Sequence, residues 1–163
     1  MTNFYSFNGT IKGITDFFTD QNDPRTGCYK FFTVEDETGM IVNFVVSPST
    51  YIVDHELLVV GDCVTGYYDG DAPAILIYPP QYPALVMVKE DFNRNVKVSY
   101  FTNQLLSSDG QLQLILYPET QILLTNGQQY SNYPGNRDLI VFYRFTTRSI
   151  PAQTTPYRII VLC

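Results

Sequence analysis

The chain has 163 residues, of which 45% are hydrophobic and 16% are charged, so it can bury a core and is not a disordered chain. The formal net charge is −6, whereas most nucleic-acid-binding proteins present a basic surface. No apolar run approaches the ~20 residues that cross a bilayer. The 13 Tyr and 11 Phe residues, with no Trp, favour strands and indicate an all-β chain.

The first half predicts five strands, with a helical or irregular piece between the third and the fourth. In the third strand Met40, Val42, Phe44 and Val46 recur with period two and share one face. After it, residues 47–50 favour the start of a short helical turn that would reach His55. This order of elements is that of an OB-fold barrel. The expected strands are residues 7–14, 29–34, 40–46, 63–68 and 84–88.

Three strings in this half resemble OB-fold domains. They are Phe7-Asn8-Gly9-Thr10-Ile11, Phe32-Thr33-Val34-Glu35-Asp36-Glu37-Thr38-Gly39 and Val60-Gly61-Asp62-Cys63-Val64. They are similar to strand 1, the hairpin of strands 2 and 3, and the entry to strand 4. The chain also resembles a group of uncharacterised bacterial proteins built from such units. These motifs describe turns and not a site. The resemblance therefore implies a fold and does not imply a binding or catalytic site.

The two halves of the chain repeat each other. Residues 38–50 are echoed by residues 109–120, and Asp62 lies 18 residues before Pro80, as Asp138 lies 18 before Pro156. A period of this length indicates one supersecondary unit used twice. We therefore expect two tandem OB-fold-like β-barrels, residues 1–90 and residues 91–163, packed together.

The second half departs from the first in two respects. Its strand over residues 96–101 is followed only by a weak partner at residues 105–106, so the second barrel is expected to be incomplete or to share a strand. An unpaired edge is usually covered, and a homodimer is the other way to cover it. Residues 120–138 form an insertion with Asn126-Gly127, which predicts an exposed hairpin or loop.

Charge is distributed unequally along the chain. Residues 1–89 hold four Lys and Arg against eleven Asp and Glu, whereas residues 90–163 hold six against five. An anion site is therefore expected only in the second half, and scattered surface arginines are the simpler interpretation. The arginines that could gather there are Arg137, Arg144, Arg148 and Arg158.

Cysteine usage and the N-terminus indicate a reducing compartment. Cys28, Cys63 and Cys163 form no CxxC pair, and their odd number leaves at least one unpaired. Residues 1–7 lack the basic start and apolar run of a signal peptide, so a cytoplasmic protein is expected.

Aromatic side chains are the first candidates for binding. Tyr29, Phe31, Tyr67 and Tyr68 could form a stacking platform in the first half, and Tyr143 could contribute to one in the second, but core or inter-domain packing is the favoured interpretation. Two proline-bearing stretches are the second candidates: residues 77–83, with Tyr78 and Tyr82, and their counterpart, residues 150–157, with Tyr157. Each could recognise a partner or simply protect a sheet edge.

No enzyme signature is present. The single histidine is His55, and phosphate loops, HExxH and paired metal-ligand spacings are missing, so no cofactor or metal is expected. The acidic loops at residues 20–23 and 69–71 lack the calcium pattern and are expected to be solvated turns.

These patterns predict a non-enzymatic binding module for a protein partner or a second copy. The alternative is binding of single-stranded nucleic acid or oligosaccharide through the barrel faces. The candidate binding residues are Tyr29, Phe31, Tyr67, Tyr68, Tyr78, Tyr82, Tyr143, Arg144, Arg148, Tyr157 and Arg158.

Overall fold

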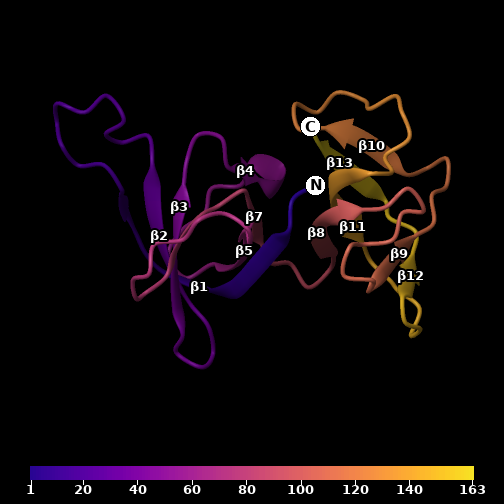
Figure 1. Cartoon of the computed structure of the whole chain (residues 1–163), viewed down its shortest axis with the longest axis horizontal. Coiled ribbons are helices and arrows are strands. Elements are labelled where there is room, and N and C mark those ends of the chain that lie inside the picture. Colours follow the sequence, from indigo (N-terminus) through magenta and orange to yellow (C-terminus); the bar gives the residue numbers. More distant parts are fainter. The chain divides into compact units, whose positions relative to one another are not determined.

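A computed structural model describes all residues from 1 to 163 (Figure 1). Strands make up 45% of the chain and helix 2%, which confirms the all-β prediction. The chain forms two compact units, one of residues 5–90 and one of residues 1–4 together with 91–163. Each unit is described by itself below, as the acidic unit (5–90) and the arginine unit (1–4 and 91–163).

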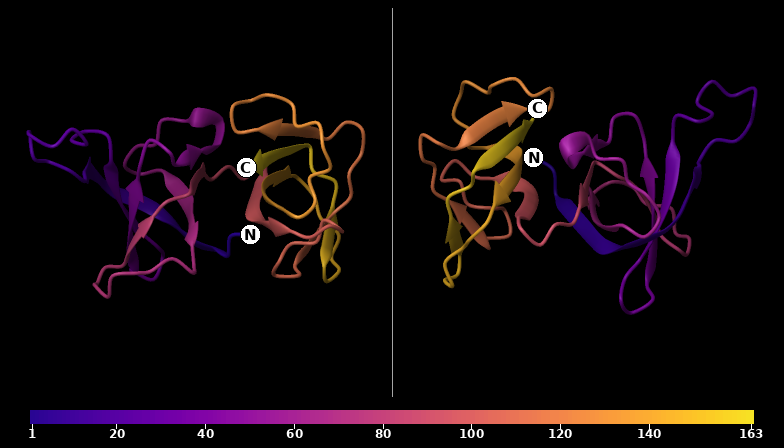
Figure 2. Two further views of the ribbon diagram at one scale, coloured as in Figure 1. Left: turned by 45° about the horizontal axis from the view of Figure 1, so that its top comes forward. Right: turned by 180° about the vertical axis from the view of Figure 1, so that it is seen from behind.

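The acidic unit contains one seven-stranded sheet in the order β4-β7-β5-β1-β2-β3-β6. Its long first loop, between β1 and β2, extends away from this sheet (Figure 2). The elements are β1 (Phe4–Asp16), β2 (Lys30–Glu35), β3 (Ile41–Val46), β4 (Tyr51–Ile52), the 3-10 turn η1 (Val53–His55), β5 (Cys63–Asp69), β6 (Gln81–Pro83) and β7 (Val86–Lys89).

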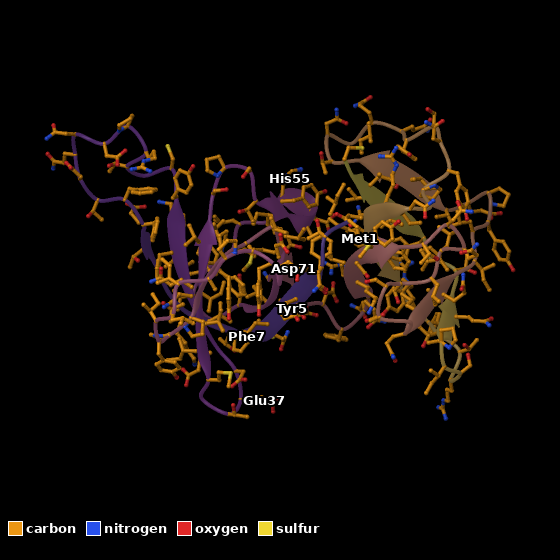
Figure 3. The ribbon with its side chains drawn as sticks, viewed as in Figure 1. Met1, Tyr5, Phe7, Glu37, His55 and Asp71 are labelled. Carbon is orange, nitrogen blue, oxygen red and sulfur yellow. The ribbon has the colours of Figure 1, made fainter.

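The β2–β3 hairpin forms where the sequence places turn residues between two alternating runs. The Asp36 carboxylate accepts bonds from the backbone N–H of Thr38 and of Met40, and Gly39 takes a φ of +86° that disfavours other residues. Glu37 lies at the tip (Figure 3). Val42, Phe44 and Val46 are buried as predicted, but Met40 is 54% exposed because it belongs to the turn.

The seven-stranded sheet curls around its core. β6 pairs in parallel with β3 at one edge and β7 pairs antiparallel with β5 near the other, although only two residues separate β6 from β7. The ring of Phe44 is fully buried and lies against Gly66, where a Cβ would come within 2.5 Å of it. The parallel pairs stack successive passes of the chain as a coil does, so the prediction of two OB barrels is not confirmed at that level of detail.

The helical turn predicted over residues 51–55 is shorter than expected. Tyr51 and Ile52 form β4 and pair in parallel with Val86 and Met87, and only Val53–His55 form a 3-10 turn. Thr50 ends the preceding turn, where its hydroxyl donates to the carbonyl oxygen of Ala84 at 2.7 Å. A contact with a distant strand therefore decides the local structure here.

The arginine unit contains a four-stranded sheet, β10-β13-β11-β8, and a two-stranded parallel sheet, β12-β9. Its largest fully buried side chains include Phe101, Phe142, Leu139 and Ile159. Two X–Pro bonds of the chain are cis, Tyr78–Pro79 and Ile150–Pro151. The strands are β8 (Asn95–Phe101), β9 (Leu112–Leu114), β10 (Gln121–Leu124), β11 (Arg137–Tyr143), β12 (Ala152–Thr154) and β13 (Arg158–Leu162).

The weak strand partner predicted at residues 105–106 is reduced to single bridges. Phe101 bridges to Ser107, and Leu106 bridges to Gln113. The insertion was predicted to be an exposed hairpin or loop, and a single bridge from Leu123 to Gln129 closes a short turn there, with residues 125–129 exposed. The N-terminus belongs to this unit, because the backbone N–H of Thr2 donates to the carboxylate of Asp138 at 3.1 Å.

Candidate functional site

The loop between β5 and β6 presents a run of exposed apolar side chains. Ile75 is 71% exposed, Leu76 is fully exposed at 100%, Ile77 is 44% exposed and Tyr78 is 77% exposed. Most large apolar side chains of a folded unit are buried, so four consecutive exposed ones form an unusual surface. We call residues 75–78 the apolar loop.

The base of the apolar loop is held by three tyrosine rings. Tyr68 on β5 stacks on Tyr82 of β6, with ring centroids 3.8 Å apart and planes 5° apart. Tyr5 of β1 meets the edge of Tyr68 at 6.0 Å and covers Gly70, where a Cβ would lie 2.5 Å from its ring. Gly70 directly follows β5, so Tyr5 lies where the chain leaves the sheet toward the apolar loop. The loop therefore leaves and rejoins the sheet at a fixed site.

The tyrosine base is partly buried and packs on the core. Tyr68 and Tyr82 both contact the buried cluster that contains Phe44, and burial together with the neighbouring Tyr82 raises the pKa of Tyr68 to about 12. Because Tyr68 and Tyr82 stack on each other, the stacked faces of these two rings are not available to a ligand. The exposed Tyr78 is the predicted candidate that remains free to meet a partner.

The predicted platform of the first half divides into two aromatic clusters. Phe31 stacks on Phe17 at 5.8 Å, and Tyr29 meets the edge of Phe18 at 5.1 Å. Arg25 lies over the Phe18 ring at 3.9 Å. These contacts gather Tyr29 and Phe31 at the β1–β2 loop, whereas Tyr68 belongs to the tyrosine base, and Tyr67 is half-buried on β5 opposite Val86.

The arginine unit carries a pocket of about 520 Å³ beside the loop that joins β11 to β12. The guanidinium of Arg144 lies 4.0 Å over the ring of Tyr157, so two predicted residues meet here. Two further residues of this pocket, Phe145 and Gln153, were not among the predicted candidates. Gln153 lies in the predicted proline-bearing stretch of residues 150–157, and Phe145 precedes that stretch. The lining residues are Ile115, Arg144, Phe145, Thr146, Thr147, Gln153, Thr154, Thr155 and Tyr157.

Backbone hydrogen bonds hold the wall of this pocket. Thr147 donates its N–H to the carbonyl of Gln153 at 2.9 Å, and Gln153 donates its N–H to the hydroxyl of Thr147 at 2.9 Å. The Thr154 hydroxyl donates to the carbonyl of Phe145 at 2.5 Å. Asn95 donates its amide to the carbonyl of Arg144 at 3.3 Å. The residues that flank the opening are thus fixed from both sides.

The remaining predicted residues of the arginine unit lie elsewhere. Tyr143 is half-buried against the core. Its pKa is raised, mainly by burial and also by the negative charge of Asp109. The guanidinium of Arg158 lies 4.0 Å over the ring of Phe142. Arg137 lies 5.4 Å over Tyr130, and Arg148 is exposed on the β11–β12 loop. The four arginines therefore do not form one cluster.

The two units carry opposite charge. Residues 5–90 contain four Lys and Arg against twelve Asp and Glu, a net charge of −8, and residues 91–163 contain six against four, a net charge of +2. Arg144 is the only charged residue that lines its pocket. Of the four arginines that could gather in the second half, Arg144 is the one that lines this pocket.

The aspartates of the acidic loops accept hydrogen bonds from neighbouring residues of the same loops. Asp20 accepts the N–H of Asn22, and Asp23 accepts the N–H and the guanidinium of Arg25, whose bonds lower the pKa of Asp23 to about 2. No group of three or more His, Cys, Asp and Glu side chains is placed to hold a metal ion. His55 is exposed, with its ring 5.6 Å from that of Tyr51.

All three cysteines, Cys28, Cys63 and Cys163, are exposed and form no disulfide. None of the helical structure is long and apolar enough to span a membrane. Comparison with protein-family models and with curated protein sequences gives no match to this chain.

Proposed function

We propose that the protein is a non-enzymatic binding module that associates with protein through the apolar loop, and that a second copy of the chain is the first partner to test. The observation that carries the proposal is the consecutive exposure of Ile75, Leu76, Ile77 and Tyr78. Apolar clusters of this kind on folded surfaces commonly mark interaction sites.

The side chains of the apolar loop expose apolar area to water. Burying a Leu or Ile side chain stabilises a protein by about 1.5–3 kcal/mol, and Leu76 gains none of this in the isolated chain. A partner that covers Leu76 and its neighbours would supply it. An aromatic or aliphatic anchor of this type contributes a large share of the affinity at many interfaces.

The tyrosine base supports the same proposal. Because Tyr68 and Tyr82 stack at 3.8 Å, the two ends of the loop are fixed before any partner binds. A preorganised loop loses less conformational entropy on binding than a free segment does.

We propose further that both units derive from one OB-like folding plan used in tandem. In the acidic unit the Thr50 hydroxyl donates to Ala84, and in the arginine unit the Thr120 hydroxyl donates to Pro156 at 2.8 Å. The parallel pairs β4–β7 and β10–β13 follow these threonines, and β5–β7 and β11–β13 are both antiparallel. Equivalent long-range contacts at equivalent positions support a common plan for the two halves.

Sedimentation velocity over a range of protein concentrations tests the role of the apolar loop. The wild-type chain is expected to self-associate as concentration rises, and Leu76→Asp is expected to remain monomeric because it places a charge at the centre of the contact. Phe92→Asp is the matched control, since Phe92 is 99% exposed and lies outside the loop.

If the wild-type chain is monomeric throughout, partner capture follows with the same three proteins. A partner retained by wild type and by Phe92→Asp, and lost by Leu76→Asp, supports the proposal. If no protein distinguishes Leu76→Asp from the control in either experiment, the apolar loop is not an interface and the proposed function is wrong.

A further inference from the structure

The pocket at Arg144 has a chemistry that the apolar loop lacks. Its one charged residue is a cation, and no carboxylate lies on its wall to neutralise that charge. An arginine without a carboxylate partner presents N–H donors that suit an anion, above all a phosphate. Tyr157 covers one face of the guanidinium at 4.0 Å and so fixes its orientation.

An exposed aromatic ring lines the same pocket as the cation. Phe145 is 84% exposed although its backbone is held by Thr154. Ile115, which directly follows β9 and donates its N–H to the carbonyl of Thr154, adds a 40% exposed apolar surface. A flat ring in water next to an arginine can stack a planar ligand group while the arginine binds an attached anion. The pocket volume of about 520 Å³ is large enough for a nucleotide-sized group.

Polar groups are also available at the rim. Gln153 lines the pocket and is exposed, with its backbone N–H bonded to Thr147, and a glutamine side-chain amide can pair with the edge of a base. Arg148 is exposed on the same β11–β12 loop and is a further positive charge of this unit. Both charges belong to the unit with net charge +2.

We infer that the arginine unit binds single-stranded nucleic acid at this pocket, with a phosphate on Arg144 and an unpaired base stacked on Phe145. The site is independent of the apolar loop, because none of residues 75–78 lines it. The arginine releases counterions from the bound phosphate, so the affinity falls as salt rises.

Fluorescence anisotropy of a labelled single-stranded oligonucleotide, at about 20 mM salt where the electrostatic contribution is large, tests this inference with the full chain. Arg144→Gln is expected to weaken binding about tenfold and to lower the salt dependence by about one released counterion. Phe145→Ala is expected to weaken binding about fivefold or more, with the salt dependence unchanged.

Two control variants isolate the site. Arg137→Gln makes the same charge change in the same unit but away from the pocket, over Tyr130, and is expected to change binding less than about twofold. Leu76→Ser removes the centre of the apolar loop without adding charge and is expected to leave oligonucleotide binding intact. A failure of the proposed protein interface and a failure of this site are therefore distinguishable.

Three results would overturn the inference. They are an absence of oligonucleotide binding at low salt, equal losses for Arg144→Gln and Arg137→Gln, and equal or tighter binding of polyglutamate, which carries anionic groups without bases. Thermal unfolding of each variant accompanies the titrations. Because Arg144 and Phe145 are exposed, their variants are expected to unfold near the wild-type temperature.

Discussion

The rings of Tyr68 and Tyr82 lie 3.8 Å apart and within 5° of parallel, although the two residues are 14 positions apart along the chain. One ring comes from the end of β5 and the other from the middle of β6, so the stack closes the loop that carries Ile75–Tyr78. The same rings pack on the core around Phe44. This contact joins the stability of the acidic unit to the geometry of its candidate interface.

Removing one ring of this stack should therefore affect both stability and association. Tyr82→Ala is expected to lower the free energy of unfolding by about 2–4 kcal/mol, because a large, partly buried ring is lost. Tyr82→Phe keeps the ring and is expected to cost less than about 1 kcal/mol. Urea unfolding measures both variants. Equal stability of Tyr82→Ala and wild type would show that the stack does not support the fold.

Gly66 is expected to tolerate no side chain, because a Cβ there would lie 2.5 Å from the buried ring of Phe44. Gly66→Ala should destabilise the protein by about 1–3 kcal/mol through overpacking. Gly13 lies in β1, and a Cβ added to it would meet no atom within 4 Å, so Gly13→Ala is the matched control and should be neutral or slightly stabilising. Thermal melts that fail to separate the two variants would contradict this packing.

Asp109 is expected to make stability depend on pH. Partial burial raises the pKa of Asp109, but the bonds from Lys97, Ser107 and Gln111 together lower it below its usual value. A lowered folded-state pKa stabilises the protein above the unfolded value near 3.8 and loses this effect as pH falls.

Asp109→Asn should thus cost about 1 kcal/mol near neutral pH, after allowance for screening at its half-exposed position, and progressively less as pH falls below 3.8 through the lowered folded-state pKa. Glu119→Gln makes the same charge change at an exposed position and is the control. Urea unfolding at a series of pH values measures the difference. A cost that stays constant with pH would show that the carboxylate charge is not responsible.

The threonines that precede the parallel pairs are expected to contribute equally in the two units. Thr50→Val and Thr120→Val each remove a hydroxyl that donates to a backbone carbonyl, at 2.7 Å and 2.8 Å, and each should cost about 1 kcal/mol. Hydrogen exchange of the neighbouring strand amides reports each unit separately. A loss of protection in one unit alone would argue against a common plan.

All three thiols are expected to react with a thiol reagent in the folded protein, because Cys28, Cys63 and Cys163 are exposed and unpaired. Mass spectrometry after brief labelling should show three additions without denaturant and no further addition with it. Fewer additions in the folded state would mean that at least one of these positions is covered.

The sequence by itself determined the strands that depend on local pattern. The alternation of Val42, Phe44 and Val46 and the turn chemistry of Asp36 and Gly39 act within a few residues, so the β2–β3 hairpin was predictable. The Asn126-Gly127 hairpin was predictable for the same reason.

Only the tertiary structure decided the contacts between distant segments. Tyr51 and Ile52 became a strand because β7 lies beside them, although their local sequence favoured a helical turn. Of the eleven candidate residues, the fold paired Tyr68 with Tyr82 and Arg144 with Tyr157. It also exposed Phe145 and Leu76 to solvent, and neither of these was a candidate. Pairing and exposure of this kind depend on which faces of distant strands meet, and the period of a side-chain pattern carries no information about that choice.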